Sequence, residues 1–236
     1  MSEIESRLIE NRVFFPNSEF AKNAKLSNMS EYLAMCQLSN KSYEQFWAQL
    51  AREFLIWHKP FTSILNDQDP PFYKWFEDGV TNTCYNALDL HVDQGKGDKL
   101  AIIYDSPITG SKENITYNKL KDKVALFAGA LKKQGVSKGD RVIIYMPMIP
   151  EAAYAMLACA RIGAVHSVVF GGFSPEALAS RITDCGASLV VTADEGPRGG
   201  KSVPLKENVN KALEISGDIK TLVVQRTGAN IYMKEN

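Results

Sequence analysis

The sequence predicts an α/β fold in which a parallel sheet flanked by helices follows a mainly helical N-terminal extension. From about residue 99 onward, short Ile- and Val-rich runs alternate with amphipathic stretches, and glycine or proline marks the ends of most of these stretches. Aromatic residues instead gather ahead of residue 80. We therefore divide the chain into a helical, aromatic-rich extension at residues 1–95 and an α/β region at residues 96–236.

The extension contains one well-marked helix. Ser42 and Gln45 have the spacing of a capping box, and apolar residues follow at helical intervals as far as Leu55. This pattern predicts a helix that ends near Pro60, and Ser30 is the predicted cap of a shorter helix ahead of it. We expect the surrounding aromatic residues to pack against the α/β region. A stacking platform for bases is the alternative, which the lack of interleaved basic residues disfavours.

The α/β region alternates strands with helices. Strands are predicted at residues 100–104, 114–116, 141–145, 166–170, 188–192 and 221–224, and helices at residues 117–134, 150–162, from 175 onward and 204–217. The apolar runs are nearly unbroken, which is typical of strands buried on both faces. Alternation of this kind predicts a parallel, Rossmann-like sheet with right-handed crossovers.

The charge balance argues against a protein that binds polyanions. The chain has 27 Lys and Arg residues against 27 Asp and Glu residues, a pI of about 6.8 and no basic run. A protein that binds nucleic acid or anionic lipid through phosphates would be expected to show a basic excess. With 45% hydrophobic and 23% charged residues, the composition is that of a soluble globular protein. We expect no nucleic-acid or membrane partner.

No targeting signal is recognised in the sequence. The first dozen residues mix acidic and basic side chains and lack the apolar core of a signal peptide. The most apolar stretch, residues 142–160, is interrupted by Pro147, Pro150 and Glu151, so it does not resemble a membrane span. The four cysteines are widely scattered, and the chain has only three histidines, which disfavours a structural zinc site. These features predict reduced thiols and a cytoplasmic location.

Two loops after predicted strands are candidate ligand sites, because ligands of open α/β sheets bind beyond the carboxyl ends of the strands. Phe170 is followed by Gly171 and Gly172 and then by a predicted helix start, which permits close backbone approach and exposes N–H groups. Residues 193–202 form a glycine-rich segment that carries Arg198 and Lys201, two cations suited to phosphate. The alternative for each loop is a purely structural connector.

Other chemical motifs fail on their spacing. The segment from Gly196 to Lys201 ends like a phosphate-binding P-loop but is one residue short, and Pro197 removes a backbone N–H that would face a phosphate. A dinucleotide fingerprint beginning at Gly95 has Leu100 where the pattern needs glycine. His166 is predicted to be a hydrogen-bonded packing residue rather than a catalyst. No catalytic or metal-binding residue is therefore predicted.

Several motifs occur in a single order along the chain: KWFEDG at residues 74–79, CYNALD at 84–89, KGDRV at 138–142, YMPMIPE at 145–151, LACARIGA at 157–164, HSVVFGGFS at 166–174 and TADEG at 192–196. In their order and spacing they closely resemble the AMP-forming acetyl-CoA and propionyl-CoA synthetases, from about residue 43 to 209. The resemblance implies that the α/β region is the first part of a larger adenylating domain.

The resemblance also implies a two-step ligase. A short carboxylate attacks ATP to give an acyl-adenylate and pyrophosphate, and the thiol of coenzyme A then displaces AMP. The full-length enzyme would use ATP, coenzyme A and Mg. On the family pattern, the nucleotide end of coenzyme A would lie against Phe170, Gly171, Gly172, Arg198, Gly199, Gly200 and Lys201.

The chain departs from the family pattern in three respects. Leu90 and Lys201 stand where family members commonly have arginine, so an ion pair and a bidentate phosphate contact are expected to be weakened. The family's ATP phosphate loop, acyl pocket and C-terminal catalytic lysine are not found in the 236 residues. We therefore expect an N-terminal fragment that is inactive alone and prone to self-association. The other hypothesis is a stand-alone α/β module that binds a nucleotide or a partner without catalysis.

Overall fold

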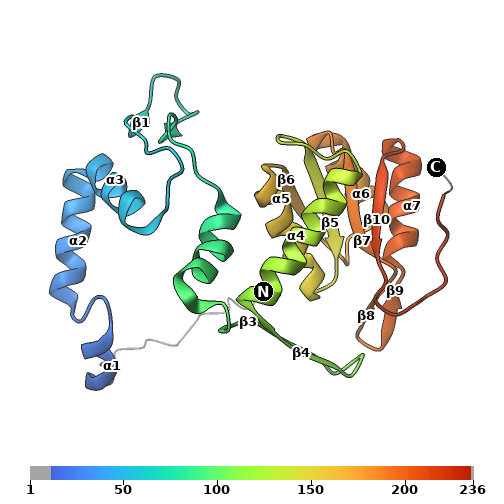
Figure 1. Cartoon of the computed structure of the whole chain (residues 1–236), viewed down its shortest axis with the longest axis horizontal. Helices are drawn as coiled ribbons and strands as arrows, with labels where there is room; N and C mark the ends of the chain where they lie inside the picture. Colours follow the sequence, from blue (N-terminus) through green and yellow to red (C-terminus); the bar gives the residue numbers. More distant parts are fainter. Residues whose placement is uncertain (1–11, 235–236) are drawn as a thin grey trace, which may run out of the picture. The chain divides into compact units, whose positions relative to one another are not determined.

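The computed structural model describes residues 12–234, which form two compact units that divide between Gly79 and Val80 (Figure 1). This division into compact units does not test the domain boundary predicted at residue 95, which stays a prediction. Residues 1–11, on which the expectation about a targeting signal mostly rests, lie outside the described residues. Within residues 12–234 no helix is both long enough and apolar enough to cross a membrane.

The first unit is mainly helical, as predicted. Its elements are α1 (Ser18–Asn23), α2 (Met29–Lys41), α3 (Tyr43–Phe54) and an antiparallel pair of short strands, β1 (Leu65–Asn66) and β2 (Lys74–Trp75). Ser42 precedes α3 as expected, but its side chain makes no capping hydrogen bond. The cap of α2 is Asn28 rather than Ser30, because the Asn28 side-chain oxygen accepts a hydrogen bond from the Glu31 N–H at 3.0 Å. Helix α3 ends at Phe54, ahead of the end predicted near Pro60, and α2 is not the shorter of the two helices. The existence of both helices is thus predictable, whereas the end of α3 and the capping contacts are not.

Aromatic side chains build the small core of this unit. Phe61 is 4% exposed and its ring centroid lies 4.9 Å from that of Trp57 and 4.3 Å from that of Phe76. The Trp57 indole N–H donates to the Ala51 carbonyl at 2.9 Å, which ties the cluster to α3. Some of the predicted packing aromatics therefore pack within their own unit.

The second unit contains the predicted parallel sheet, with strand order β10-β7-β5-β6. Its strands are β5 (Arg141–Met146), β6 (Val165–Phe170), β7 (Leu189–Ala193) and β10 (Lys220–Val224), each within one residue of the prediction. Every residue of β7 is buried, as is all of β5 beyond Arg141, because both strands are central. Strands β6 and β10 form the two edges.

Helices cover both faces of this sheet. They are α4 (Tyr117–Lys133), α5 (Pro150–Ile162), α6 (Pro175–Cys185) and α7 (Leu205–Ser216), and α4 and α5 pack on one face while α6 and α7 pack on the other. The connections from β5 and β7 therefore run to opposite faces, so the sheet's topological switch point lies between these neighbouring strands. Ligands of such sheets bind beyond the carboxyl ends of the strands near this point.

The first two predicted strands of the α/β region do not join the parallel sheet. Strands β3 (Leu100–Ser106) and β4 (Ser111–Thr116) instead pair with each other in antiparallel register as a separate hairpin (Figure 1). A parallel crossover needs roughly a dozen residues or more, and the few residues between these strands allow only a hairpin. Two short π-helical segments, η1 (Tyr85–Asp89) and η2 (Val92–Lys96), were also not predicted.

Candidate functional site

The first candidate loop is a tight turn at the end of β6. The Phe173 N–H donates to the Phe170 carbonyl at 3.0 Å, which places Gly171 and Gly172 at the centre of the turn. Neither glycine has a positive φ, so the turn does not need glycine for its backbone conformation. It needs glycine for space, since a Cβ on Gly171 would lie 3.3 Å from the Met146 carbonyl oxygen.

The second candidate loop is a β-hairpin rather than an open glycine-rich loop. Strands β8 (Gly196–Arg198) and β9 (Lys201–Val203) are antiparallel, and the turn between them consists of Gly199 and Gly200. Both glycines have positive φ, +56° and +75°, which matches the two-residue turn that right-twisted hairpins favour. The segment predicted as a glycine-rich loop is thus a short hairpin, whose ladder engages part of its backbone.

The two loops meet through Arg198. Its guanidinium carbon lies 4.9 Å from the centroid of the Phe170 ring, and Phe170 is 55% exposed at the end of β6. A Cβ on Gly172 would lie 2.6 Å from Nη1 of Arg198 and 2.6 Å from the Phe170 ring. Gly172 thus leaves the space in which the guanidinium stacks on the ring, a role that its position in the sequence did not reveal.

The remaining predicted residues lie around this stack. Lys201 is the cross-strand partner of Arg198 in the hairpin, and Gly199 and Gly200 form the tip beside them. Within residues 12–234 neither cationic side chain has an ion pair or a hydrogen bond. Like charges at directly paired strand positions destabilise a hairpin, so an anion bound between Arg198 and Lys201 would relieve their repulsion.

A buried tyrosine lies beneath the turn and was missed by sequence reasoning. The Tyr145 side chain is wholly buried in β5, and its hydroxyl lies 2.8 Å from the Phe173 carbonyl oxygen and 3.3 Å from that of Gly171. Burial raises the pKa of this hydroxyl above its usual value, so it remains a proton donor. The Asn208 side-chain amide donates to the same hydroxyl at 3.3 Å. The sequence does contain one sign of this role, namely a tyrosine among the aliphatic residues of a predicted buried strand.

A second cation and ring extend the site. The Phe173 ring lies edge-on to Phe170 with centroids 5.9 Å apart, and the Arg181 guanidinium carbon lies 4.7 Å from the Phe173 centroid. The adjoining start of α6 is less open to an anion than predicted. The Ser174 side chain already caps the Ala177 N–H at 3.3 Å, and Glu176 places a carboxylate in the first turn.

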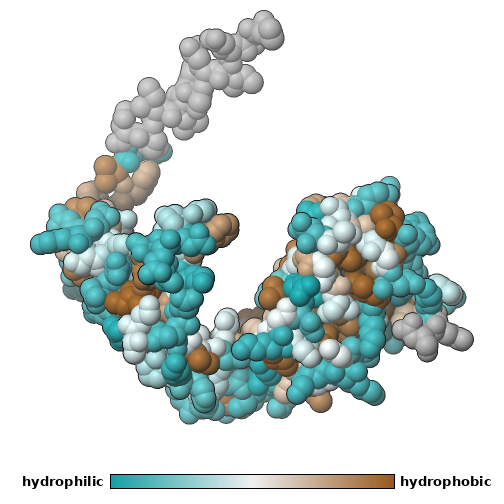
Figure 2. Space-filling model, turned by 90° about the horizontal axis from the view of Figure 1, so that it is seen from above, coloured by the Kyte–Doolittle hydropathy of each residue, from teal (hydrophilic) through white to brown (hydrophobic). Residues whose placement is uncertain are grey.

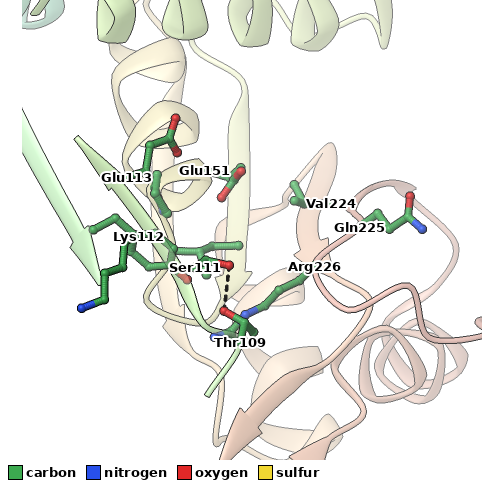
Figure 3. A pocket seen from close by; sticks show the side chains of 11 residues that line it. Thr109, Ser111, Lys112, Glu113, Glu151, Val224, Gln225 and Arg226 are labelled. Carbon is green, nitrogen blue, oxygen red and sulfur yellow. Dashed lines mark hydrogen bonds between the residues drawn. The ribbon is translucent and has the colours of Figure 1, made fainter. Parts of the chain in front are cut away.

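A pocket of about 450 Å³ opens elsewhere in the second unit, between the β3–β4 hairpin, the start of α5 and the residues after β10 (Figure 3). Figure 3 shows Arg226 directed toward Thr109 and Ser111, while Glu113 and Glu151 line the pocket farther away. The buried Nε of Arg226 has no hydrogen-bond partner within residues 12–234. No motif joins these distant residues, so sequence reasoning missed the pocket. Because cations and carboxylates line it together, net charge does not select its ligand.

His166 is not the packing residue that was predicted. Its side chain is exposed on edge strand β6, and within the described part of the chain it makes no hydrogen bond. Strand β6 lies at the edge of the sheet, where the flanking helices leave His166 uncovered. In residues 12–234 no group of three or more His, Cys, Asp or Glu side chains is arranged to hold a metal ion.

The chain matches two protein families. The profile of the AMP-binding enzymes matches residues 89–234, and that of the acetyl-coenzyme A synthetase N-terminus matches residues 32–87. Among similar curated proteins, the acetyl-coenzyme A synthetase of Cupriavidus metallidurans is 50% identical over all of this chain, and that of Paraburkholderia phymatum is 51% identical over 98% of it. The chain spans only 36% and 35% of the lengths of these two relatives.

Proposed function

The chain belongs to the AMP-binding enzyme family, and from this premise we propose that it is part of an AMP-forming short-chain acyl-CoA synthetase. The substrate would be a small carboxylate, acetate or propionate. The whole protein would activate it with ATP to an acyl-adenylate, releasing pyrophosphate, and would then transfer the acyl group to the thiol of coenzyme A, releasing AMP. Acetate is favoured by the names of the relatives, which are acetyl-coenzyme A synthetases at about 50% identity.

Within this reaction we assign the described residues to the nucleotide end of coenzyme A. A single observation carries the assignment. Arg198 and Lys201 are strand partners without an anionic partner within residues 12–234, and Arg198 lies over the exposed ring of Phe170. An aromatic face can stack on a base, and guanidinium and ammonium groups bind phosphates through charge-assisted hydrogen bonds. Gly172 keeps this surface open, while Gly171 lets the turn lie close to the Met146 carbonyl. Gly199 and Gly200 form the turn that places the two cations side by side.

We assign no side chain within residues 12–234 to the binding of ATP or Mg²⁺. The described part of the chain lacks a cluster of ligating side chains suited to a metal ion, and the family's ATP phosphate loop is not found in the 236 residues. We therefore propose that this chain by itself does not form an acyl-adenylate. The net charge of zero argues against a nucleic-acid or membrane partner bound through phosphates. We also propose a cytoplasmic location, on the scattered cysteines of the sequence.

Coenzyme A binding to this chain, measured by isothermal titration calorimetry, tests the site. A charge-assisted hydrogen bond to phosphate contributes about 1.5–3 kcal/mol, so Arg198→Ala should weaken binding roughly tenfold or more. The matched control is Arg52→Ala, which removes another guanidinium stacked on a phenylalanine ring, 4.6 Å from the Phe61 centroid in the first unit. It should leave coenzyme A binding unchanged.

Two further comparisons complete this experiment. Coenzyme A that lacks its 3′-phosphate shows which phosphate Arg198 contacts. If Arg198 binds the 3′-phosphate, Arg198→Ala should no longer weaken binding of this analogue. If Arg198 binds the diphosphate, the loss of affinity should persist. Pyrophosphate exchange with ATP and acetate should stay at the buffer level. Equal binding by wild type and Arg198→Ala would contradict the assignment. Exchange above the buffer level would contradict the proposal that adenylation needs residues outside this chain, and binding of AMP without coenzyme A would favour a stand-alone nucleotide-binding module.

A further inference from the structure

We propose that Tyr145 is a positioning residue for coenzyme A binding, acting through the turn at residues 170–173. This inference rests on the proposed function and deepens it. Tyr145 is wholly buried, so it cannot touch a ligand itself. Its hydroxyl instead reaches the backbone of the turn from β5, a central strand of the sheet that is buried beyond Arg141.

The Tyr145 hydroxyl has one proton, so it can donate a hydrogen bond to only one of two carbonyl oxygens of the turn at a time. The contact with the Phe173 carbonyl oxygen, at 2.8 Å, is the shorter one, and the Gly171 carbonyl oxygen at 3.3 Å is the alternative acceptor. These carbonyl groups flank Gly172, the residue above which Arg198 lies. A shift of the turn by a few tenths of an ångström would therefore change the space between the Phe170 ring and Arg198.

The same tyrosine also reaches the segments on either side of the hairpin. The Thr192 hydroxyl, in β7 just before the hairpin, donates to the Tyr145 carbonyl at 2.8 Å. The Asn208 amide, in α7 just after the hairpin, donates to the Tyr145 hydroxyl at 3.3 Å. One residue thus connects both polypeptide segments of the candidate site, one bearing Phe170 and Gly172 and the other bearing Arg198.

The test is Tyr145→Phe, which keeps the buried ring and removes only the hydroxyl. We expect coenzyme A affinity to fall about threefold to tenfold in calorimetric titration of the chain. The amide NMR signals of residues 171–173 should also shift before any ligand is added. The matched control is Tyr154→Phe. Tyr154 is another buried tyrosine of the same unit, 6% exposed, whose hydroxyl has no hydrogen bond within the described residues.

The outcomes separate this inference from the proposed function. Wild-type affinity in Tyr145→Phe, or an equal loss in Tyr154→Phe, overturns the positioning role while Arg198→Ala still reports the site. If wild-type chain binds no coenzyme A, or if Arg198→Ala binds normally, the proposed site fails and the inference fails with it. Should Tyr145→Phe not fold, Asn208→Ala replaces it. This variant removes the amide that donates to the Tyr145 hydroxyl and leaves the buried tyrosine in place. A coenzyme A affinity within about twofold of wild type would then overturn the proposal.

Discussion

At the scale of single residues, the glycines of the candidate site serve two different physical needs. Gly172 is required for space, because a side chain there would collide with Arg198 and Phe170. Gly199 is favoured for conformation, because its φ is +56° while no atom lies within 4 Å of the place that a Cβ would occupy. A sequence shows that both positions are glycine, and only coordinates distinguish the two reasons.

Leu90 shows how a departure from a family pattern can be tolerated. The sequence predicts that its replacement of arginine weakens a local ion pair. The neighbouring Asp89 is nevertheless held by the Arg161 guanidinium at 2.6 Å, and the Lys121 ammonium lies 3.8 Å away. The Asn82 amide donates to the Ala160 carbonyl at 3.2 Å and so ties this region to the end of α5. Neighbouring cations thus satisfy Asp89 without an arginine at residue 90.

Asp78 predicts an acid-dependent stability of the first unit. Its carboxylate accepts hydrogen bonds from the Thr62 hydroxyl at 2.6 Å and from the N–H groups of Thr62 and Ser63 at 3.0 Å. These bonds, the Thr62 hydroxyl first, lower the pKa of Asp78 from 3.8 to about 2. A lowered carboxyl pKa contributes stability that is present above pH 3.8 and is lost as the pH falls through about 2.

Asp78→Asn should therefore unfold at a lower temperature than wild type at neutral pH, and the difference should shrink between pH 4 and pH 2, the window set by the two pKa values. All three tryptophans lie in the first unit, so their fluorescence reports its unfolding. The control is Asp67→Asn, whose carboxylate makes no hydrogen bond within residues 12–234. A difference that stays constant over this pH range would contradict the prediction.

At the scale of elements, the sequence predicts what depends on local pattern and misses what depends on pairing. The four parallel strands, helices α4, α5 and α7 and the start of α6 are predicted within one residue, because burial on both faces and glycine or proline at helix ends leave strong signals. The pairing of β3 with β4, and the hairpin within residues 193–202, were missed. Both involve short connections whose partners are chosen by geometry rather than by residue type.

The candidate site was predictable in the same partial way. Its residues were identified because loops after strands carry ligands, and the structure brings Phe170, Gly172 and Arg198 together as a stack. Tyr145 and Arg181 were missed, since one is hidden in a strand and the other lies on a helix surface. Support beneath a site leaves little trace in a sequence, because it is defined by contacts between distant residues.

The hairpin turn gives a prediction at this scale. Asparagine is favoured at the first position of a turn in which both central residues have positive φ, so Gly199→Asn should change the free energy of unfolding by less than about 0.5 kcal/mol. Gly199→Val should destabilise the second unit by about 1–2 kcal/mol, because a branched side chain is strained at positive φ. Urea unfolding followed by circular dichroism measures both. Equal stability of the two variants would show that the turn does not keep its +56° φ in solution.

At the scale of the whole molecule, the edges of the four-stranded sheet determine how copies of the chain are expected to interact. Edge strands present unpaired backbone groups, and proteins protect them with charged residues, proline or a covering element. Strand β10 begins with a charged residue, Lys220, whereas β6 carries no Lys, Arg, Asp or Glu. The apolar residues Val165, Val168 and Phe170 of β6 are 54%, 57% and 55% exposed. Strand β6 is therefore the less protected edge.

The α/β unit also exposes apolar surface beyond this edge, visible in Figure 2 as brown patches between teal ones. Burial of exposed apolar surface favours association, at roughly 25 cal/mol for each Å² removed from water. We therefore propose that the chain self-associates through β6, by backbone pairing reinforced by its apolar side chains. Light scattering after size-exclusion chromatography should show an apparent mass that rises with concentration above 26.2 kDa.

Val168→Lys should suppress this self-association, because a charge on an edge strand opposes pairing with a second copy. The side chain is 57% exposed, so a lysine reaches solvent without entering the core. The control is Ile103→Lys, which places the same charge on β3, where the isoleucine is 72% exposed and the strand already pairs with β4. If the wild-type chain stays monomeric as its concentration rises, β6 is protected in solution. Equal suppression by both lysines would mean that added charge, rather than the β6 edge, controls the association.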